Sequence, residues 1–336
     1  MARRDHRRRA RGPLRDDAQL LRRHGRSAVR RSLGAGFALA ALVAVVAVPP
    51  APRDAAAAPS FDAGAAWRDV VRLVELGPRP AGSAALARAR QYIVGELTRA
   101  GLQVRLASFE ARTPDGPIAM ANVIAVLPGR RRDVIMLGGH YDTKLFTDFR
   151  FVGANDGGSS AGLLLELARR LAGRRHEFTY WVVFFDGEEA RRDWSATDGI
   201  YGSRQLAAEL RRSGEIRRLR SVIVVDMIGD ANLDIRRESY STPWLTDLVW
   251  ASARRLGYGA YFRSDAIAVE DDHAPFLRAR VPAVDVIDID YPPWHTAGDT
   301  LEQISPKSLG IVGEVILDTL PALETVLSRG RVGGPE

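Results

Sequence analysis

After residue 60 the chain alternates short apolar runs of strand character with amphipathic helical segments, and this alternation restricts the fold more than any other feature. Alternating strands and helices imply right-handed crossovers and a mostly parallel, twisted sheet with helices on both faces. A run without polar residues, such as that from Trp181 to Phe185, is typical of a strand buried on both sides. We therefore expect a single α/β domain over residues 61–330.

The periodicity of apolar residues places the individual elements. Ser83 can cap a helix whose apolar positions recur every three to four residues and which ends at Gly101. Runs of β-branched and aromatic residues predict strands at 104–109, 122–127, 134–139, 179–185, 221–226 and 283–287. Further helices are expected at 159–172, 201–212, 243–256 and 271–279, and a last one begins at 305–306.

The positive charge of the chain lies in its first residues. The formal net charge is +7, but residues 1–31 hold twelve Arg and three Asp, a net of +9, so the other 305 residues carry about −2. The folded part is therefore not basic. We expect no nucleic-acid partner.

An apolar segment follows this basic arm. Residues 33–48 are uncharged, and a Pro/Ala-rich linker occupies 49–60. A positive flank, an apolar run and a small-residue exit indicate an export signal or a membrane anchor, with residues 1–32 left in the cytoplasm. The run is shorter than the about 20 residues of a full span, so cleavage and retention are both open. Arg30 and Arg31 also resemble a twin-arginine export motif. We expect the catalytic part to be extracytoplasmic.

The absence of cysteine restricts any metal chemistry. Without thiolates, a zinc ion would need imidazole and carboxylate ligands, and the chain has only six His. Residues of these types stand where predicted strands run out into polar loops, and such loops converge on one crevice of an open α/β sheet. These residues are His140, Asp156, Glu189, Asp226 and His295.

Some of these positions also have an explanation when they are taken alone. Asp156 precedes a Leu-rich helical segment, and taken alone it is better explained as the N-cap of that helix. Glu188 and Glu189 leave a buried strand in different directions, so one can bind a metal while the other reaches a substrate. Asp226 ends an apolar run, where a buried carboxylate needs a cation or hydrogen bonds. Their shared place at strand ends favours a common site.

The order of these residues resembles the motif of the co-catalytic zinc aminopeptidases. The segments around them are more similar to those of the glutaminyl cyclases, the glutaminyl-peptide cyclotransferases that share that fold. The positions specific to the cyclases are Trp194, Asp271 and Trp294. The similarity extends over about residues 66–328, in segments that include His140–Lys144, Phe184–Ala190, Tyr201–Arg204, Asp271–His273, Pro275–Arg278 and Trp294–Thr296.

The resemblance to the cyclases implies a metal site with one zinc ion. Its ligands would be Asp156, Glu189 and His295, which leaves an open position for a substrate carbonyl or a water. The substrate would be the N-terminus of a peptide or protein. Its N-terminal glutamine would be converted to pyroglutamate with release of ammonia.

The same resemblance implies roles for the residues around the zinc ligands. Glu188 would be the general acid and base, and Asp226 and Asp271 would form a hydrogen-bond network that perturbs its pKa. Trp194 and Trp294 would form the walls of the substrate pocket. These five positions complete the implied site.

The chain departs from the cyclases at three points. Asp285 stands where they have a histidine near the site, and the segment from there to Trp294 is one residue shorter. The residues from His295 to Thr300 are more similar to the corresponding segment of the aminopeptidases. These changes affect the substrate side of the pocket rather than the metal ligands.

Two alternatives to a cyclase therefore stay open. The first is an aminopeptidase with two zinc ions, in which Asp156 bridges and His140 and Asp226 complete the second site. The second is a membrane-tethered ectodomain that keeps the fold without the chemistry. The presence of a suitable residue at every catalytic position argues against the ectodomain.

Overall fold

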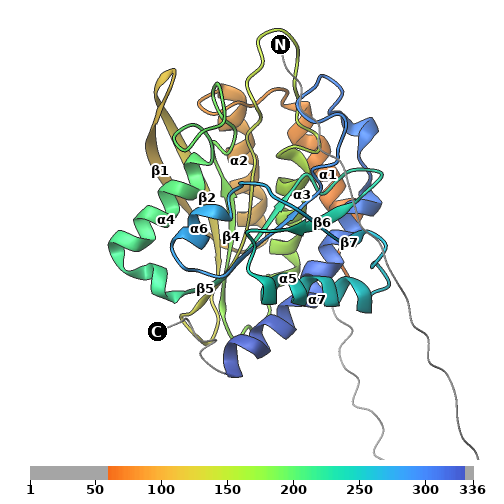
Figure 1. Ribbon diagram of the computed structural model, residues 1–336. Coiled ribbons are helices and arrows are strands. Elements are labelled where there is room, and N and C mark those ends of the chain that lie inside the picture. The colour runs from red at the N-terminus through yellow and green to blue at the C-terminus, as the bar shows by residue number, and fades with distance from the viewer. Residues whose placement is uncertain (1–59, 330–336) are drawn as a thin grey trace, which may run out of the picture. The chain divides into compact units, whose positions relative to one another are not determined.

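In the computed structural model, which describes residues 60–329, a sheet of six strands runs in the order β1-β2-β4-β3-β5-β8 (Figure 1). The strands β4, β3, β5 and β8 are parallel to one another, and β8 forms one edge of the sheet. Strand β2 is antiparallel to both β1 and β4. The expected mostly parallel α/β sheet is confirmed. The strands are β1 (Gln103–Thr113), β2 (Gly116–Leu127), β3 (Val134–His140), β4 (Thr179–Phe185), β5 (Leu219–Asp226) and β8 (Ala283–Ile287).

Helices cover both faces of the sheet, as expected. Successive strand residues point to opposite faces, so Leu137 joins one hydrophobic core while Met136 joins the other. The first face carries α1 (Ala63–Glu75), α2 (Ala84–Arg99), α3 (Gly158–Leu171), α5 (Pro243–Arg255) and α7 (Pro306–Arg329). The second face carries α4 (Tyr201–Ser213) and α6 (Ala274–Arg278), at the left of Figure 1.

Some elements differ from the sequence-based expectation. The two strands expected before residue 128 are longer and form a hairpin, closed by Gly116 with a φ of 101°. Helix α1 and a second sheet of β6 (Ile235–Glu238) and β7 (Phe262–Ile267) are not predicted by the apolar pattern. β6 contains two adjacent arginines, and most of β7 is exposed, so neither has the alternation of a half-buried strand.

The parallel strands bring the candidate site residues to one edge of the sheet. β3 ends at His140 and β5 at Asp226, while Glu188 follows the end of β4 by three residues. The carboxyl ends of neighbouring parallel strands lie at the same edge, where a crevice forms in open α/β sheets.

Residues 1–59 lie outside the described residues. They include the expected basic arm at 1–32, the apolar segment at 33–48 and nearly all of the linker at 49–60. Across residues 60–329, no helix combines the length and the apolar character that crossing a membrane requires. The domain boundaries expected at 61 and 330 stay a prediction.

Candidate metal centre

Three side chains that the resemblance implies as zinc ligands lie together. The Nε2 atom of His295 is 3.3 Å from Oδ2 of Asp156 and 3.2 Å from Oε1 of Glu189. Ligand atoms at about 2.0–2.2 Å from a tetrahedral zinc ion lie about 3.3–3.6 Å from one another. The spacing of these nitrogen and oxygen atoms therefore fits a zinc ion, and Oδ2 of Asp156 is buried without a hydrogen-bond partner among the described residues.

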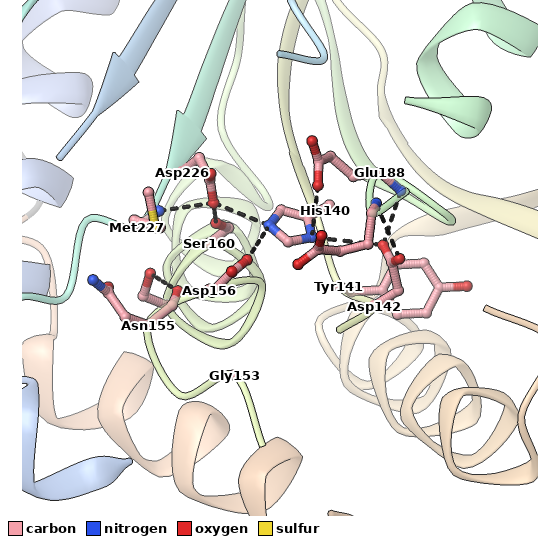
Figure 2. A network of polar contacts seen from close by, with 12 residues as sticks. His140, Tyr141, Asp142, Gly153, Asn155, Asp156, Ser160, Glu188, Asp226 and Met227 are labelled. Carbon is pink, nitrogen blue, oxygen red and sulfur yellow. Dashed lines mark hydrogen bonds and ion pairs between the residues drawn. The ribbon is translucent and has the colours of Figure 1, made fainter. Parts of the chain in front are cut away.

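A second group of possible ligands lies beside the first. Nε2 of His140 is 3.2 Å from Oδ1 of Asp156 and 3.0 Å from Oδ1 of Asp226 (Figure 2). Oδ1 of Asp226 also accepts hydrogen bonds from Ser160 and from the backbone N–H of Met227. Asp156 is shared by both groups, one oxygen facing each histidine, so the arrangement can hold one ion with a supporting shell or two bridged ions.

The loop before α3 positions Asp156. Asp299 accepts hydrogen bonds from the backbone N–H groups of Asn155, at 2.8 Å, and Asp156, at 3.1 Å. Gly157 has a φ of 77°, and a Cβ atom there would lie 2.3 Å from the carbonyl oxygen of Asp142. The alternative explanation of Asp156 as the N-cap of α3 does not hold, because the N-cap is Gly157 and no side chain caps this helix. The Asp156 carboxylate is thus free to face the histidines.

The turn after β4 positions the two glutamates. The carboxylate of Asp142 accepts hydrogen bonds from the backbone N–H groups of Glu188, at 3.1 Å, and Glu189, at 3.4 Å. Gly187 supplies the φ of 71° that lets the chain turn out of the sheet. Glu189 then faces His295, while Oε2 of Glu188 lies 4.0 Å from Nδ1 of His140 (Figure 2).

The backbone and the neighbouring rings fix His295. Its φ of 53° is in the left-handed region, which non-glycine residues adopt mainly where the surrounding structure enforces it. Trp294 stacks on the imidazole with ring centroids 4.4 Å apart, and Phe146 and Phe151 contact it edge to face. This packing aims Nε2 at the two carboxylates.

Three buried residues that support the site are missed by the sequence reasoning. Asp142 and Asp299 hold the glutamates and the Asp156 loop, as described above. Arg79 is fully buried and donates to the backbone carbonyls of Tyr141, Val152 and Gly153, so it ties the end of β3 to the same loop. The only local signal for Arg79 is its place between two prolines, which predicts a turn rather than a buried cation.

The pKa values of the site residues are shifted because several carboxylates are buried together. Burial disfavours the charged form of His295, but its close contacts with the carboxylates of Asp156 and Glu189 outweigh this and raise its pKa to about 9. Burial and the neighbouring Asp156 charge raise the pKa of Glu189 to about 7. Burial, followed by the charges of Glu189 and Asp271, raises the pKa of Glu188 well above its usual range against the opposing effect of His140. Such a cluster of buried carboxylates favours a bound cation.

A pocket of about 510 Å³ opens over these residues. Trp194 and Trp294 lie at its rim and are 42% and 44% exposed. Asp271 lines it from the loop before α6 and is buried, whereas Asp285 is buried in β8 and is not among the lining residues. The structure therefore brings the expected ligands, the expected base and the expected tryptophans to one cavity, whose lining also includes Met227, Val269, Ile287 and Ile289.

The fold and this cluster define a zinc exopeptidase-like α/β protein. The profile of peptidase family M28 matches residues 122–320, and the chain belongs to that family. Members of this family typically bind zinc, which agrees with the buried group of Asp156, Glu189 and His295.

Within the family, the chain is similar to proteins named as glutaminyl cyclases, so the resemblance noted from the sequence is confirmed. Glutaminyl-peptide cyclotransferase of Drosophila melanogaster is 30% identical over 278 residues, 75% of this chain and 78% of the relative. A crystal structure of an Acidobacteriales bacterium glutaminyl cyclase is 38% identical, with a TM-score of 0.79 over 84% of this chain and all of that one. A leucine aminopeptidase precursor of Bacteroides thetaiotaomicron is 28% identical, with a TM-score of 0.72 over 78% of this chain and 97% of its own.

Proposed function

We propose that the protein is a zinc-dependent glutaminyl-peptide cyclotransferase, which converts the N-terminal glutamine of peptides or proteins to pyroglutamate and releases ammonia. The observation that carries the proposal is one pocket that joins a zinc-type ligand group, Glu188 and two rim tryptophans. The similarity to proteins named as glutaminyl cyclases supports it.

The reaction needs one group that moves a proton. The substrate's α-amine attacks its own γ-amide carbon, so a C–N bond forms while the amide C–N bond breaks and its nitrogen leaves as ammonia. Glu188 takes the proton from the amine and delivers it to the departing nitrogen. Burial raises the pKa of Glu188, which is the direction that a carboxyl group needs if it must both accept and donate a proton. A zinc ion at Asp156, Glu189 and His295 would polarise the γ-carbonyl.

The pocket residues then have to fold the substrate onto itself. An intramolecular attack gains most of its rate from orientation, and rigid aromatic walls restrict the glutamine side chain to a bent form. Trp194 and Trp294 stand at the rim, and Trp194 Nε1 lies 3.5 Å from Oε2 of Glu270. Asp271 and Asp226 line the same cavity beside Glu188.

The alternative function is that of a di-zinc aminopeptidase. It is favoured by the second complete ligand group, in which atoms of His140, Asp156 and Asp226 all lie within 4.8 Å of one another. In that case Glu188 would activate a water for hydrolysis of the first peptide bond. The similarity to a protein described as a leucine aminopeptidase precursor is consistent with this alternative.

Two matched peptides distinguish the functions. The zinc-loaded full chain is incubated with a peptide that begins with Gln and with one that begins with Leu but is otherwise identical. Ammonia and a pyroglutamyl product from the first peptide are expected, with about one zinc per chain. No ammonia release from zinc-loaded protein would overturn the proposal. Release of free Leu by protein with two zinc ions per chain would establish the peptidase.

We also propose that the catalytic domain faces away from the cytoplasm and that peptide N-termini reach it there. The support is the basic arm at 1–32 followed by the apolar segment at 33–48. Protease added to intact cells should degrade residues 61–330. Their protection until the membrane is opened would contradict this placement.

A further inference from the structure

A third buried group of ionisable side chains adjoins the pocket, which one of its members lines. It consists of Asp271 in the loop before α6, His273 at the N-cap of α6, and Asp285 in the middle of β8. One oxygen or nitrogen atom of each lies within 4.8 Å of the others, and the three residues are 3%, 0% and 0% exposed. The proposed function uses Asp271 but gives no role to Asp285.

The oxygens of the two aspartates are not satisfied by ordinary donors. Within residues 60–329, both carboxyl oxygens of Asp285 and Oδ2 of Asp271 are buried without a hydrogen-bond donor. The other oxygen, Oδ1 of Asp271, accepts from the backbone N–H of Asp272. Two such carboxylates repel each other when both are ionised, but one proton between them turns the repulsion into a hydrogen bond.

The groups that face Asp285 explain which aspartate carries the proton. Burial and then the charges of Asp271, Asp226 and Glu238 raise the pKa of Asp285 well above its usual range. His273 approaches from α6, but its Nδ1 is 3.8 Å from Oδ2 of Asp285, beyond hydrogen-bond distance. The other nitrogen of His273 lies 3.1 Å from Glu238. Asp285 is therefore surrounded mainly by negative charge, which favours its neutral form.

We propose that Asp285 is a positioning residue that carries a proton and donates it in a hydrogen bond to Oδ2 of Asp271. Asp271 is then held by two donors, the Asp272 N–H on one oxygen and the Asp285 carboxyl on the other, and keeps its charge beside Glu188. The effect of this bond on turnover rests on the proposed cyclase function. The bond itself does not.

This role accounts for the departure noted in the sequence. The resemblance to the cyclases implies a histidine at the position of Asp285, and a histidine can also donate one hydrogen bond to a carboxylate. A protonated aspartic acid is an equivalent donor as long as its surroundings keep it neutral. The buried negative groups around β8 supply that condition here.

Three variants separate hydrogen-bond donation from packing. Asp285→Asn keeps the shape and an N–H donor, Asp285→His introduces the residue that the resemblance implies, and Asp285→Ala removes the donor. With zinc-loaded full chain, kcat should stay within about threefold of wild type for Asn and fall at least about tenfold for Ala, with KM within about twofold. The kcat of Asp285→His should be nearer to that of Asp285→Asn than to that of Asp285→Ala. An Ala variant with wild-type kcat, or an Asn variant as slow as Ala, would overturn the role.

Infrared difference spectroscopy tests the proton without any turnover. At pH 7 the spectrum of wild type minus Asp285→Asn should contain the carbonyl band of a buried protonated carboxylic acid. The control Asp247→Asn, which changes an exposed aspartate on α5, should not remove that band. A missing band overturns the proposal even if the enzyme is a cyclase. A band in a protein that releases no ammonia leaves this proposal standing and removes the proposed function.

Metal analysis of the same variants tests whether the third group holds a cation instead of a proton. The positioning role predicts the same zinc content per chain in wild type, Asp285→Asn and Asp285→Ala. Loss of one equivalent of bound metal on either substitution would make the group a metal site and overturn the proposal.

Discussion

Oδ1 of Asp156 lies 3.2 Å from Nε2 of His140, while the other oxygen of the same carboxylate faces His295 at 3.3 Å. A single side chain thus connects the two possible metal positions. How many ions bind depends on whether His140 acts as a ligand or only as a hydrogen-bond partner of Asp226, 3.0 Å away.

Substitution of each histidine should show which of the two possible metal positions binds zinc. His295→Ala should lower zinc affinity at least about 100-fold, because it removes one of the three proposed ligands. His140→Ala should leave about one zinc per chain, because its contacts with Asp156 and Asp226 would be those of a supporting group. Zinc is measured by elemental analysis after dialysis against a weak chelator. A drop from two ions to one in His140→Ala would identify His140 as a ligand of a second zinc.

Substitution of the adjacent glutamates should separate chemistry from metal binding. Glu188→Gln should reduce kcat at least about 100-fold while zinc content stays unchanged, because the amide cannot take up the proton of the attacking amine. Glu189→Gln should lose zinc, since its Oε1 is one of the atoms facing His295. Kinetics and elemental analysis are measured on both variants. Equal zinc loss in the two would argue against a division of roles between Glu188 and Glu189.

Trp294 should affect substrate binding more than stability. It is 44% exposed and stacks on His295 at a pocket rim, so Trp294→Ala removes part of the proposed substrate wall and leaves the His295 ring without its stacking partner. We expect KM for a Gln-initiated peptide to rise about tenfold, about 1.4 kcal/mol, with the melting temperature almost unchanged. Leu106→Ala, at an exposed position on β1, is the control and should alter neither quantity. An unchanged KM would exclude Trp294 from the substrate wall.

Arg79 should be one of the largest single contributors to stability. Its buried guanidinium donates to three backbone carbonyls, and Arg79→Met would leave all three without a donor. We expect a loss of about 3–5 kcal/mol in the free energy of unfolding. Arg72→Met, at an exposed position on α1, should change it by less than about 0.5 kcal/mol. Urea unfolding of both variants is the measurement. Equal effects would show that the carbonyl contacts do not stabilise the loop.

The sequence could predict the strands that carry the site because they are long, apolar and buried on both faces. The strands that end at His140 and Asp226 could be predicted for this reason. Their parallel orientation follows from the helices between them. The antiparallel hairpin could not be predicted, because the expected strands at 104–109 and 122–127 end before the turn at Gly116.

The site was predictable at the level of ligand types but not of contacts. Asp156 gave the same local signal as a helix cap, and only the fold shows that Gly157 takes that place. Asp142 and Asp299 act through backbone N–H groups that are distant in sequence from them, between 46 and 144 residues away. No local pattern reports such pairings, since they depend on which loops the fold brings together.

Asp288, just after β8, should make the metal-free protein less stable as the pH rises. Burial, followed by the charges of Asp230 and Asp234, raises its pKa to about 7 against the opposing N–H of Asp234. The folded state therefore holds this proton more tightly than the unfolded chain does. The resulting stability is complete below about pH 4 and is lost as the pH rises through 7.

Asp288→Asn removes this titration, so its free energy of unfolding should exceed that of wild type increasingly between about pH 4 and pH 7. The shift in pKa limits the gain to about 4 kcal/mol. Urea unfolding across this range measures the difference, with Asp247→Asn as an exposed control that should track wild type. A difference that stays constant with pH would mean that Asp288 is ionised throughout. Because Asp288 is not among the proposed zinc ligands, this result would be independent of how many metal ions bind.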